Sequence, residues 1–458
     1  MKIMKLAIYT ALVIAFGTFQ SIAGTMSFSI VDLGTKVTPT AINNKGQVVG
    51  YSITDDGHIH AFLYENQILT DLGTFGGTDS EALAINGSGH IVGNYFKYGY
   101  KHAFLLYNSQ FTDMFGLAGM IEATGINDQN VMIGDIVSTP DMGSTHVILY
   151  DNGLVTDISV LGEIQGVTYP FISASPRGIN NKGQAIFFQG LCGSWECEHS
   201  YVFSGETVSE IFPFNATDIN DLGQVVGSSM REWGQVDSYL YNQGDLTRIN
   251  DFGGNYSYPT ALNNVGQVIG TAQYSQDYKF HPFIYFNETM KDLNTLIPAD
   301  SGWDITKVSD INDKGQIIGT GLLNGEQHAF VLSPLVQTVQ IDIRPSDADN
   351  EINLRANGKL TVVIFSSTMF DATAINPESV ILSGAGIAKV GKGDKYLYDL
   401  EDINGDGLID LICHVYVDQL EVTPDVLLQI LELDAETFGG QKVRGEDKVS
   451  LVSGQNQH

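Results

Sequence analysis

One ten-residue motif occurs seven times, in varied forms, in this 458-residue sequence and constrains its fold more than any other feature. The first copy is AINNKGQVVG, at Ala41–Gly50. The leading asparagines of successive copies lie 43, 41, 53, 40, 43 and 49 residues apart, which is the range of propeller blades. They are Asn43, Asn86, Asn127, Asn180, Asn220, Asn263 and Asn312. Seven copies of one unit predict seven similar pieces of structure.

Each repeat contains four short segments of strand-like composition, and the first two are joined by a tight turn. Asn43 starts this turn, and Gly46 supplies the positive φ that closes it. The third copy has Asn130 at the glycine position, and asparagine is the next most tolerant residue there. The second strand ends on glycine in every copy, as at Gly50, which indicates close approach of another backbone. We therefore predict an all-β repeat.

Six of the ten histidines occupy one position in the third strand of the repeat. One interpretation is a ring of imidazoles that binds a metal or an anion. The favoured interpretation is architectural, with each histidine hydrogen-bonded inside its own repeat to the aspartate of the TDLG-like fourth strand. Coordination needs only three or four ligands, whereas blade packing requires the same residue in every repeat. The six are His60, His102, His146, His199, His281 and His328, and the fifth repeat has Asp237 instead.

The seventh repeat ends at Pro334 without a fourth strand, and a spare copy of that strand, IVDLG, precedes the first repeat at Ile30–Gly34. An N-terminal strand that completes the last blade would close the ring and leave no sheet edge. The sequence therefore predicts a seven-bladed β-propeller over residues 24–334. The alternative is an open β-solenoid, which would need no spare strand.

The repeated segments AIN-x-x-GQVVG, HAFLY and DLGTFGG, in one fixed order between about residues 28 and 334, resemble the bacterial extracellular HAF repeat family. This resemblance implies an exported protein. It implies no catalytic residue.

The first residues have the pattern of a secretory signal peptide. Lys2 and Lys5 precede an apolar run from Leu6 to Phe16, and small residues end at Ala23. We expect residues 1–23 to be removed, giving a secreted or periplasmic bacterial protein; the alternative is an N-terminal membrane anchor. No later apolar stretch is long enough to span a membrane. A net charge of −30 excludes nucleic acid as a partner.

The fourth repeat carries an insertion, Gln189–His199, which contains Cys192, Trp195 and Cys197. Two cysteines five residues apart in an exported protein predict a small disulfide-closed loop. Trp195 would then be a candidate binding residue, because loops on a rigid scaffold commonly carry recognition. The alternative is that the disulfide-closed insertion has no binding role and Trp195 packs against its own blade. The third cysteine, Cys413, lies in an apolar run and is expected to be a buried free thiol.

The repeats stop after Pro334, and the strand-like segments that follow do not repeat one another. We predict a linker at 335–339, a separate β-sandwich at 340–453 and a short tail at 454–458. The run VLLQILEL within it could form a strand or a short helix. Segments such as IDIRPSDADNEINL, FDATAINPESVIL and LEDINGDGLIDL resemble a C-terminal β-sandwich module of many exported bacterial proteins.

The strongest chemical motif is the run DINGDGLID within this predicted sandwich. Oxygen-bearing side chains at relative positions 1, 3, 5 and 9, glycine at 6 and a backbone carbonyl at 7 reproduce a calcium-binding loop. Position 12 is Cys413 instead of glutamate, and strands flank the loop, so it resembles β-hairpin calcium loops rather than an EF-hand. The alternative is an acidic turn that binds no ion. We predict a structural calcium ion held by Asp402, Asn404, Asp406, Leu408 and Asp410.

No G-x-S-x-G, H-E-x-x-H, phosphate-loop, dinucleotide or sialidase-type motif occurs in the chain. The favoured hypothesis is a non-catalytic, exported binding or adhesion protein whose propeller loops recognise an extracellular carbohydrate or protein. A polysaccharide hydrolase or lyase is the alternative, and a structural envelope component is the third. Unrepeated acidic, histidine or tyrosine side chains converging at one channel mouth would favour the enzyme, whereas a channel lined only by repeat residues would favour binding.

Overall fold

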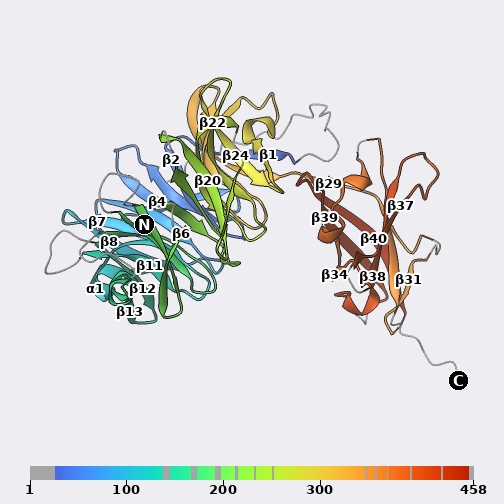
Figure 1. Ribbon diagram of the computed structural model, residues 1–458, viewed down its shortest axis with the longest axis horizontal. Coiled ribbons are helices and arrows are strands. Elements are labelled where there is room, and N and C mark those ends of the chain that lie inside the picture. Colours follow the sequence, from blue (N-terminus) through green and yellow to red (C-terminus); the bar gives the residue numbers. More distant parts are fainter. Residues whose placement is uncertain are drawn as a thin grey trace. The chain divides into compact units, whose positions relative to one another are not determined.

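The computed structural model describes residues 26–452, apart from gaps at 138–144, 167–172, 191–197, 212–214, 232–233, 250–251, 346, 348, 356–357, 369, 392–394 and 424–425. The chain divides into two compact units, Met26–Leu335 and Val336 onward, next to the predicted linker. Almost all regular structure in the described residues is β-strand (Figure 1). No helix in this part of the chain is long and apolar enough to cross a membrane. The predicted signal peptide, Cys192, Trp195 and Cys197 lie outside the described residues.

The first unit consists of consecutive groups of four antiparallel strands, one for each sequence repeat. Five groups form separate four-stranded sheets, and the other two are joined into one eight-stranded sheet by a single parallel pairing of β20 with β22. In order, the groups are β2–β5 (Val37–Ile42, Val48–Ile53, Ile59–Glu65, Ile68–Gly73), β6–β9 (Asp79–Ile85, Ile91–Lys97, Tyr100–Tyr107, Gln110–Asp113), β10–β13 (Met120–Ile126, Met132–Val137, Thr145–Asp151, Leu154–Asp157), β14–β17 (Ala174–Ile179, Ala185–Gly190, Glu198–Ser204, Thr207–Ile211), β18–β21 (Asn215–Ile219, Val225–Met230, Val236–Asn242, Asp245–Arg248), β22–β25 (Gly253–Leu262, Val268–Tyr274, Phe280–Phe286, Thr289–Asp292) and β26–β28 (Trp303–Ile311, Ile317–Leu323, Glu326–Pro334) with β1 (Phe28–Gly34).

The N-terminal strand β1 is the fourth strand of the last group, as the spare copy of the motif predicts. It pairs antiparallel with β28, from Phe28 opposite Pro334 to Gly34 opposite Ala329. In Figure 1 the blue β1 accordingly lies beside the yellow strands at the end of the unit. Phe28 is completely buried in a core cluster that includes Phe330 of its own group and Leu296, which follows the sixth group. The first and last strands of the unit are thus held together by backbone bonds and by core packing.

The turn of the repeat has the predicted conformation, but the second strand continues past its repeated glycine in six groups, as β3 does beyond Gly50, and ends on it only at Gly190. Gly46 and Asn130 have φ values of 79° and 64°. A side chain on Gly50 would place its Cβ 2.1 Å from the carbonyl oxygen of Thr38, in the first strand of the same group. The register of each first strand shifts near this point, as between Pro39 and Ala41. The close approach that the glycine pattern predicts is therefore made to a bulged neighbouring strand.

Short helices follow the fourth strand of some groups. Helices α1 (Met114–Ala118) and α2 (Ile158–Ile164) and the 3-10 turn η3 (Leu293–Thr295) each begin directly after the aspartate that ends the strand. Asp113, for example, accepts hydrogen bonds from the backbone N–H groups of Phe115 and Gly116. An aspartate at this position caps the helix because the first backbone N–H groups have no partner within it.

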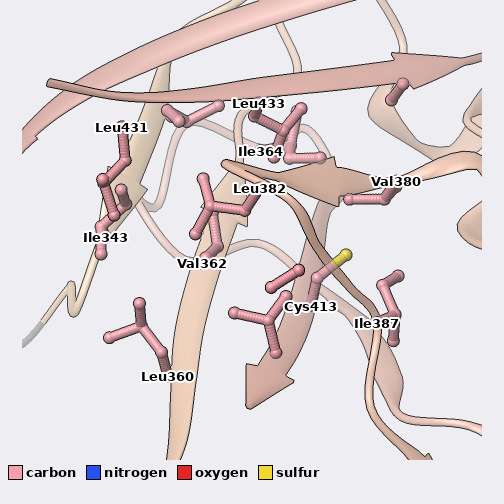
Figure 2. Packing of buried hydrophobic residues seen from close by; sticks show 14 of the residues in the cluster. Ile343, Leu360, Val362, Ile364, Val380, Leu382, Ile387, Cys413, Leu431 and Leu433 are labelled. Atoms are coloured by element: carbon pink, nitrogen blue, oxygen red, sulfur yellow. The ribbon is translucent and has the colours of Figure 1, made fainter. Parts of the chain in front are cut away.

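The second unit contains two main sheets that share one buried core. One sheet has the order β30-β32-β38-β37, and the other has the order β29-β40-β39-β33-β34 with β31 beside β40. Figure 2 shows Val362 and Cys413 from the first sheet and Leu431 and Leu433 from the second among the core residues. Cys413 is free and fully buried, as predicted, and burial raises its pKa to about 12. The run VLLQILEL lies mostly in strand β39.

The strands of the second unit are β29 (Val336–Thr338), β30 (Ile341–Ile343), β31 (Glu351–Asn353), β32 (Lys359–Ile364), β33 (Ile381–Leu382), β34 (Ala385–Gly386), β35 (Lys389–Val390), β36 (Lys395–Tyr396), β37 (Tyr398–Glu401), β38 (Asp410–Tyr416), β39 (Leu428–Glu436) and β40 (Lys442–Val452). Three 3-10 turns lie between them, η4 (Ala372–Ala374), η5 (Pro377–Ser379) and η6 (Val417–Gln419).

Candidate functional site

The seven repeated asparagines form a closed cycle of hydrogen bonds. The side-chain Nδ2 of Asn43 donates to the backbone carbonyl of Asn86 at 2.9 Å, and Asn86 donates in the same way to Asn127. The pattern continues through every repeat, and Asn312 returns to the carbonyl of Asn43. The asparagines are 2–5% exposed. Each amide therefore links two neighbouring repeats at a buried position.

The same asparagines also hold their own turns. Asn43 Oδ1 accepts from the backbone N–H groups of Lys45 and Gln47, at 3.0 and 3.1 Å. The carboxamide uses its oxygen within the repeat and its nitrogen toward the next repeat. The position needs one side-chain atom that accepts within the turn and a second that donates to the next repeat. Asparagine has both, whereas ionised aspartate has no donor and serine has only one oxygen, which explains why neither occurs in any copy. The sequence motif predicted the turn, whereas the bonds between repeats were not predicted.

A second ring of bonds is made by the residues that follow the asparagines. The backbone N–H of Gly87 donates to the Asp128 carboxylate at 2.7 Å, and that of Asp128 donates to the Asn181 side chain at 2.8 Å. Equivalent bonds continue along the ring to Asn44. The last bond of the series would run from the backbone N–H of Asn44 to a side chain at position 87. Gly87 has no side chain, so the series of bonds stays open there. Six of seven positions therefore carry an asparagine or aspartate acceptor, a sequence signal that could have revealed this ring.

These two rings line a small channel of about 200 Å³. Its wall consists of the same three positions from all seven repeats, such as Ile42, Asn43 and Asn44, with Asp218 as the single addition among the described residues. The polar groups of the wall mostly bond to one another, in the closed cycle of asparagines and in the second series of bonds, which is open at Gly87. Asp218 is the one acid of the described wall that does not occupy one of the three repeated positions. This wall therefore consists mainly of repeated residues.

Asp218 and Asp310 stand two residues before the repeated asparagine, where the other five repeats have alanine or glycine. Asp310 accepts from the backbone N–H groups of Ile311 and of Ile42 in the next repeat, both at 2.8 Å. Asp218 makes the equivalent bonds to Ile219 and Leu262. Burial raises the pKa of Asp218 to about 6, and burial together with the nearby charge of Asp218 raises that of Asp310 to about 7. These two carboxyl groups therefore link neighbouring repeats, and their raised pKa values favour the protonated form.

Five of the six histidines bond to a carboxylate of the fourth strand, as the architectural interpretation predicts, whereas His102 lies 3.6 Å from Asp113, beyond hydrogen-bond distance. His60 and His146 contact the carboxylates of Asp71 and Asp157 at 2.9 and 2.7 Å, each eleven residues further on. His328 reaches Asp32 of β1 at 2.9 Å, because β1 supplies the missing fourth strand. The remaining pairs are His102 with Asp113, His199 with Glu210 and His281 with Asp292.

The fifth repeat reverses the charges of this pair. Asp237, only 1% exposed, stands at the histidine position, and Arg248 lies eleven residues later. Arg248 and Arg231 both donate to Asp237 Oδ1, at 3.0 and 2.9 Å. An arginine at the aspartate position thus preserves a buried ion pair between the third and fourth strands. The equal spacing of eleven residues could have revealed it from the sequence.

The DINGDGLID loop of the second unit is held in a tight curve by its own acidic side chains. Asp402 accepts from the backbone N–H groups of Gly405, Asp406 and Gly407. Asp410 is fully buried, and its two oxygens accept from the backbone N–H groups of Ile403 and Ser366. Asp410 therefore fastens the loop to the neighbouring chain segment.

The donor chemistry of this loop fits a calcium ion. Asn404 and Asp406 are exposed and linked to each other at 3.1 Å, and the Leu408 carbonyl follows them. Within the described residues, no group of three or more His, Cys, Asp or Glu side chains is placed to hold a metal. Of the five predicted ligands, Asp402, Asn404, Asp406 and Leu408 have the oxygens that would hold calcium, which prefers hard oxygen ligands. Asp410, the fifth, is buried, and both its oxygens accept from backbone N–H groups.

The sequence matches no protein-family model and no curated protein. Solved structures with a similar fold include the β-propeller domain of the Trilobed protease from Pyrococcus furiosus, at 12% identity and a TM-score of 0.44, covering 68% of this chain and 94% of that one. TolB from Acinetobacter baumannii aligns at 14% identity and a TM-score of 0.32, covering 63% and 80%. Pyrococcus horikoshii acylaminoacyl peptidase aligns at 10% identity and a TM-score of 0.43, covering 77% and 60%. The protein is all-β, with a fold of the β-propeller type.

Proposed function

We propose that this protein is an exported, non-catalytic binding protein of the bacterial envelope or extracellular space, built on a closed seven-bladed β-propeller of HAF type. The lining of the channel carries the proposal. All described wall residues except Asp218 occupy the same three positions of the repeat, and their polar groups bond to one another in one closed cycle and one open series. Repetition of this kind serves the scaffold, and the residues left for recognition are those that differ between blades.

The seven blades are supported by three independent features. Seven four-stranded groups follow one another along the chain. The asparagine bonds return to their starting residue after seven steps. Strand β1 fills the place of the missing last strand. An open solenoid would leave Asn312 without Asn43 as its acceptor.

The second unit is proposed to be a β-sandwich whose DINGDGLID loop binds structural calcium. Two sheets share one core, and the loop lies directly before β38 of one of them. The bound ion would bring together the oxygens of Asp402, Asn404 and Asp406 and balance the charge of the two carboxylates. Calcium at the millimolar concentrations outside cells would fill even a weak site.

The binding proposal is tested by assaying one purified preparation for binding and for turnover. Glycan and protein arrays measure binding, while release of reducing ends and absorbance of unsaturated uronates measure hydrolase and lyase activity on the same glycans. Binding without turnover is the expected result. Turnover that scales with protein concentration, or no binding on either array, would overturn the proposal.

A further inference from the structure

An exposed group of aromatic side chains lies on the sixth strand group, between strands β22 and β24 (both labelled in Figure 1). The ring centroids of Tyr256 and Tyr258 lie 6.4 and 6.1 Å from that of Phe280. Tyr258 is 39% exposed and Phe280 is 48% exposed. We define these three residues as the aromatic platform. Large aromatic rings that remain in water on a folded surface are typical of binding sites.

The platform is not part of the repeated architecture. Tyr256 and Tyr258 alternate with the buried Ser257, so both project from one face of β22. Ser257 fixes the strand from the other face through a 2.7 Å hydrogen bond to Ser238 of the neighbouring group. The corresponding position in the first repeat is occupied by Thr38 and Lys36, which are not aromatic. The platform therefore breaks the repeat, as a recognition surface on this scaffold should.

Amide side chains surround the same strand end. Gln235 Nε2 donates to Asn255 Oδ1 at 3.2 Å, which leaves Asn255 Nδ2 and Gln235 Oε1 without a partner among the described residues. Gln273 holds the hairpin next to Phe280, accepting from Asn255 N–H and donating to the Tyr278 carbonyl. Tyr278 is itself 72% exposed. Uncharged donors and acceptors thus stand beside the aromatic rings.

We propose that the aromatic platform binds a neutral polysaccharide. The C–H faces of sugar rings are apolar and fit against aromatic rings, while sugar hydroxyls pair with amides and tyrosine hydroxyls. The charge of −30 repels acidic polymers, and the platform residues carry no charge at neutral pH. This proposal rests on the proposed binding function and names its ligand class.

The test is native affinity electrophoresis of the full chain in gels containing hydroxyethylcellulose, laminarin, galactomannan or arabinoxylan, with polygalacturonate as the anionic comparison. Retardation by at least one neutral polymer is expected. The variants Tyr258→Ala and Phe280→Ala should each weaken it by about tenfold, because a central aromatic anchor commonly carries this much binding energy. Tyr100→Ala, which removes a tyrosine that is 71% exposed on another group, is the matched control and should leave retardation unchanged.

The variants change exposed side chains, so their melting temperatures should equal that of the parent protein. Absence of retardation by all four neutral polymers would overturn the proposal, as would equal retardation of parent and platform variants. If the platform variants instead lose binding to a protein on the array, the ligand is a protein, and the polysaccharide proposal fails while the binding function stands. Turnover of a polymer would overturn the binding function itself.

Discussion

The side chain of Asn312 donates to the backbone carbonyl of Asn43 at 2.9 Å, across 269 residues of sequence. This is the step at which the cycle of asparagine bonds closes. Each other step joins consecutive repeats, so only this one depends on the two ends of the unit meeting. The side-chain nitrogen of Asn312 thus links the last repeat to the first. Its side-chain oxygen accepts from the backbone N–H groups of Lys314 and Gln316 and so holds its own turn.

Removal of this side chain should destabilise the first unit strongly. Asn312→Ala leaves two turn N–H groups, those of Lys314 and Gln316, without their acceptor, and the Asn43 carbonyl keeps only its bond from the Gly46 N–H. Because buried groups without partners cost about 1–3 kcal/mol each, we expect a loss of about 2–4 kcal/mol in the free energy of unfolding. Urea unfolding followed by fluorescence measures it. Asn242→Ala, at an exposed hairpin end, should change stability by less than about 0.5 kcal/mol. Equal effects for the two variants would contradict a structural role of the cycle.

Closure by β1 gives a second prediction, with its control in the same strand. Phe28 is completely buried, whereas Val31 is 42% exposed. Phe28→Ala should cost about 3–5 kcal/mol, because it removes a large ring from a packed core. Val31→Ala should cost less than about 1 kcal/mol. Thermal unfolding of both variants measures the difference. If Phe28→Ala melted with the parent protein, β1 would not be needed to complete the last group.

Much of this architecture is readable from the sequence, because it repeats. The Asn43–Gly46 turn, the glycine at position 50 and the spare strand at Ile30–Gly34 each follow from local chemistry, and the structure has all three. Most of the histidine-carboxylate pairs also follow, since both partners lie in one repeat, and the spare strand predicts the exception, His328 with Asp32. Local rules do not show which side chains face each other across repeats. The bond from Asn43 to Asn86 needs the spacing between two sheets, which no single repeat contains.

The platform and the reversed ion pair were missed for a different reason. Both occur once, so repetition does not draw attention to them. Tyr256 and Phe280 are 24 positions apart and meet only when β23 is paired between their strands. Asp237 and Arg248 keep the eleven-residue spacing of the histidine pairs, but with the charges exchanged. A search for spacing without regard to residue type would have found this pair.

Asp218 and Asp310, which link neighbouring repeats, predict an unusual dependence of stability on pH. Their folded pKa values, about 6 for Asp218 and about 7 for Asp310, lie above the ordinary value of 3.8. Between pH 4 and 7 the folded state therefore binds more protons than the unfolded state, so stability should fall as pH rises through this window. Melting temperatures at pH 5.5 and 8 measure the effect. In Asp218→Asn/Asp310→Asn the slope should flatten, whatever the absolute stability. An unchanged slope would assign the dependence to other groups.

The buried ion pair of the fifth repeat can be tested by exchange. Asp237→Asn removes the buried charge that faces two guanidinium groups and should destabilise the protein by about 1–3 kcal/mol, because the arginines left behind are 40% and 42% exposed and stay solvated. The double variant Asp237→His/Arg248→Asp recreates the pair found in the other repeats and should recover part of that loss. Urea unfolding of the parent, single and double variants gives the comparison. If the double variant were less stable than Asp237→Asn, the two arrangements would not be equivalent.

Calcium binding by the DINGDGLID loop is the last prediction. Titration calorimetry of the whole protein, freed of metal by a chelator, should show calcium binding and a higher melting temperature of the second unit. Asp406→Ala should abolish both effects, because it removes an exposed carboxylate from a set of only four oxygen donors. Asp399→Ala, which removes an exposed carboxylate of β37 outside the loop, is the control and should bind as the parent does.

Asp410 should behave differently from Asp406. Its oxygens are taken by the Ile403 and Ser366 N–H groups, so Asp410→Ala should lower stability even without calcium. No heat in the parent protein would leave the loop an acidic turn, held by Asp402 and Asp410 alone.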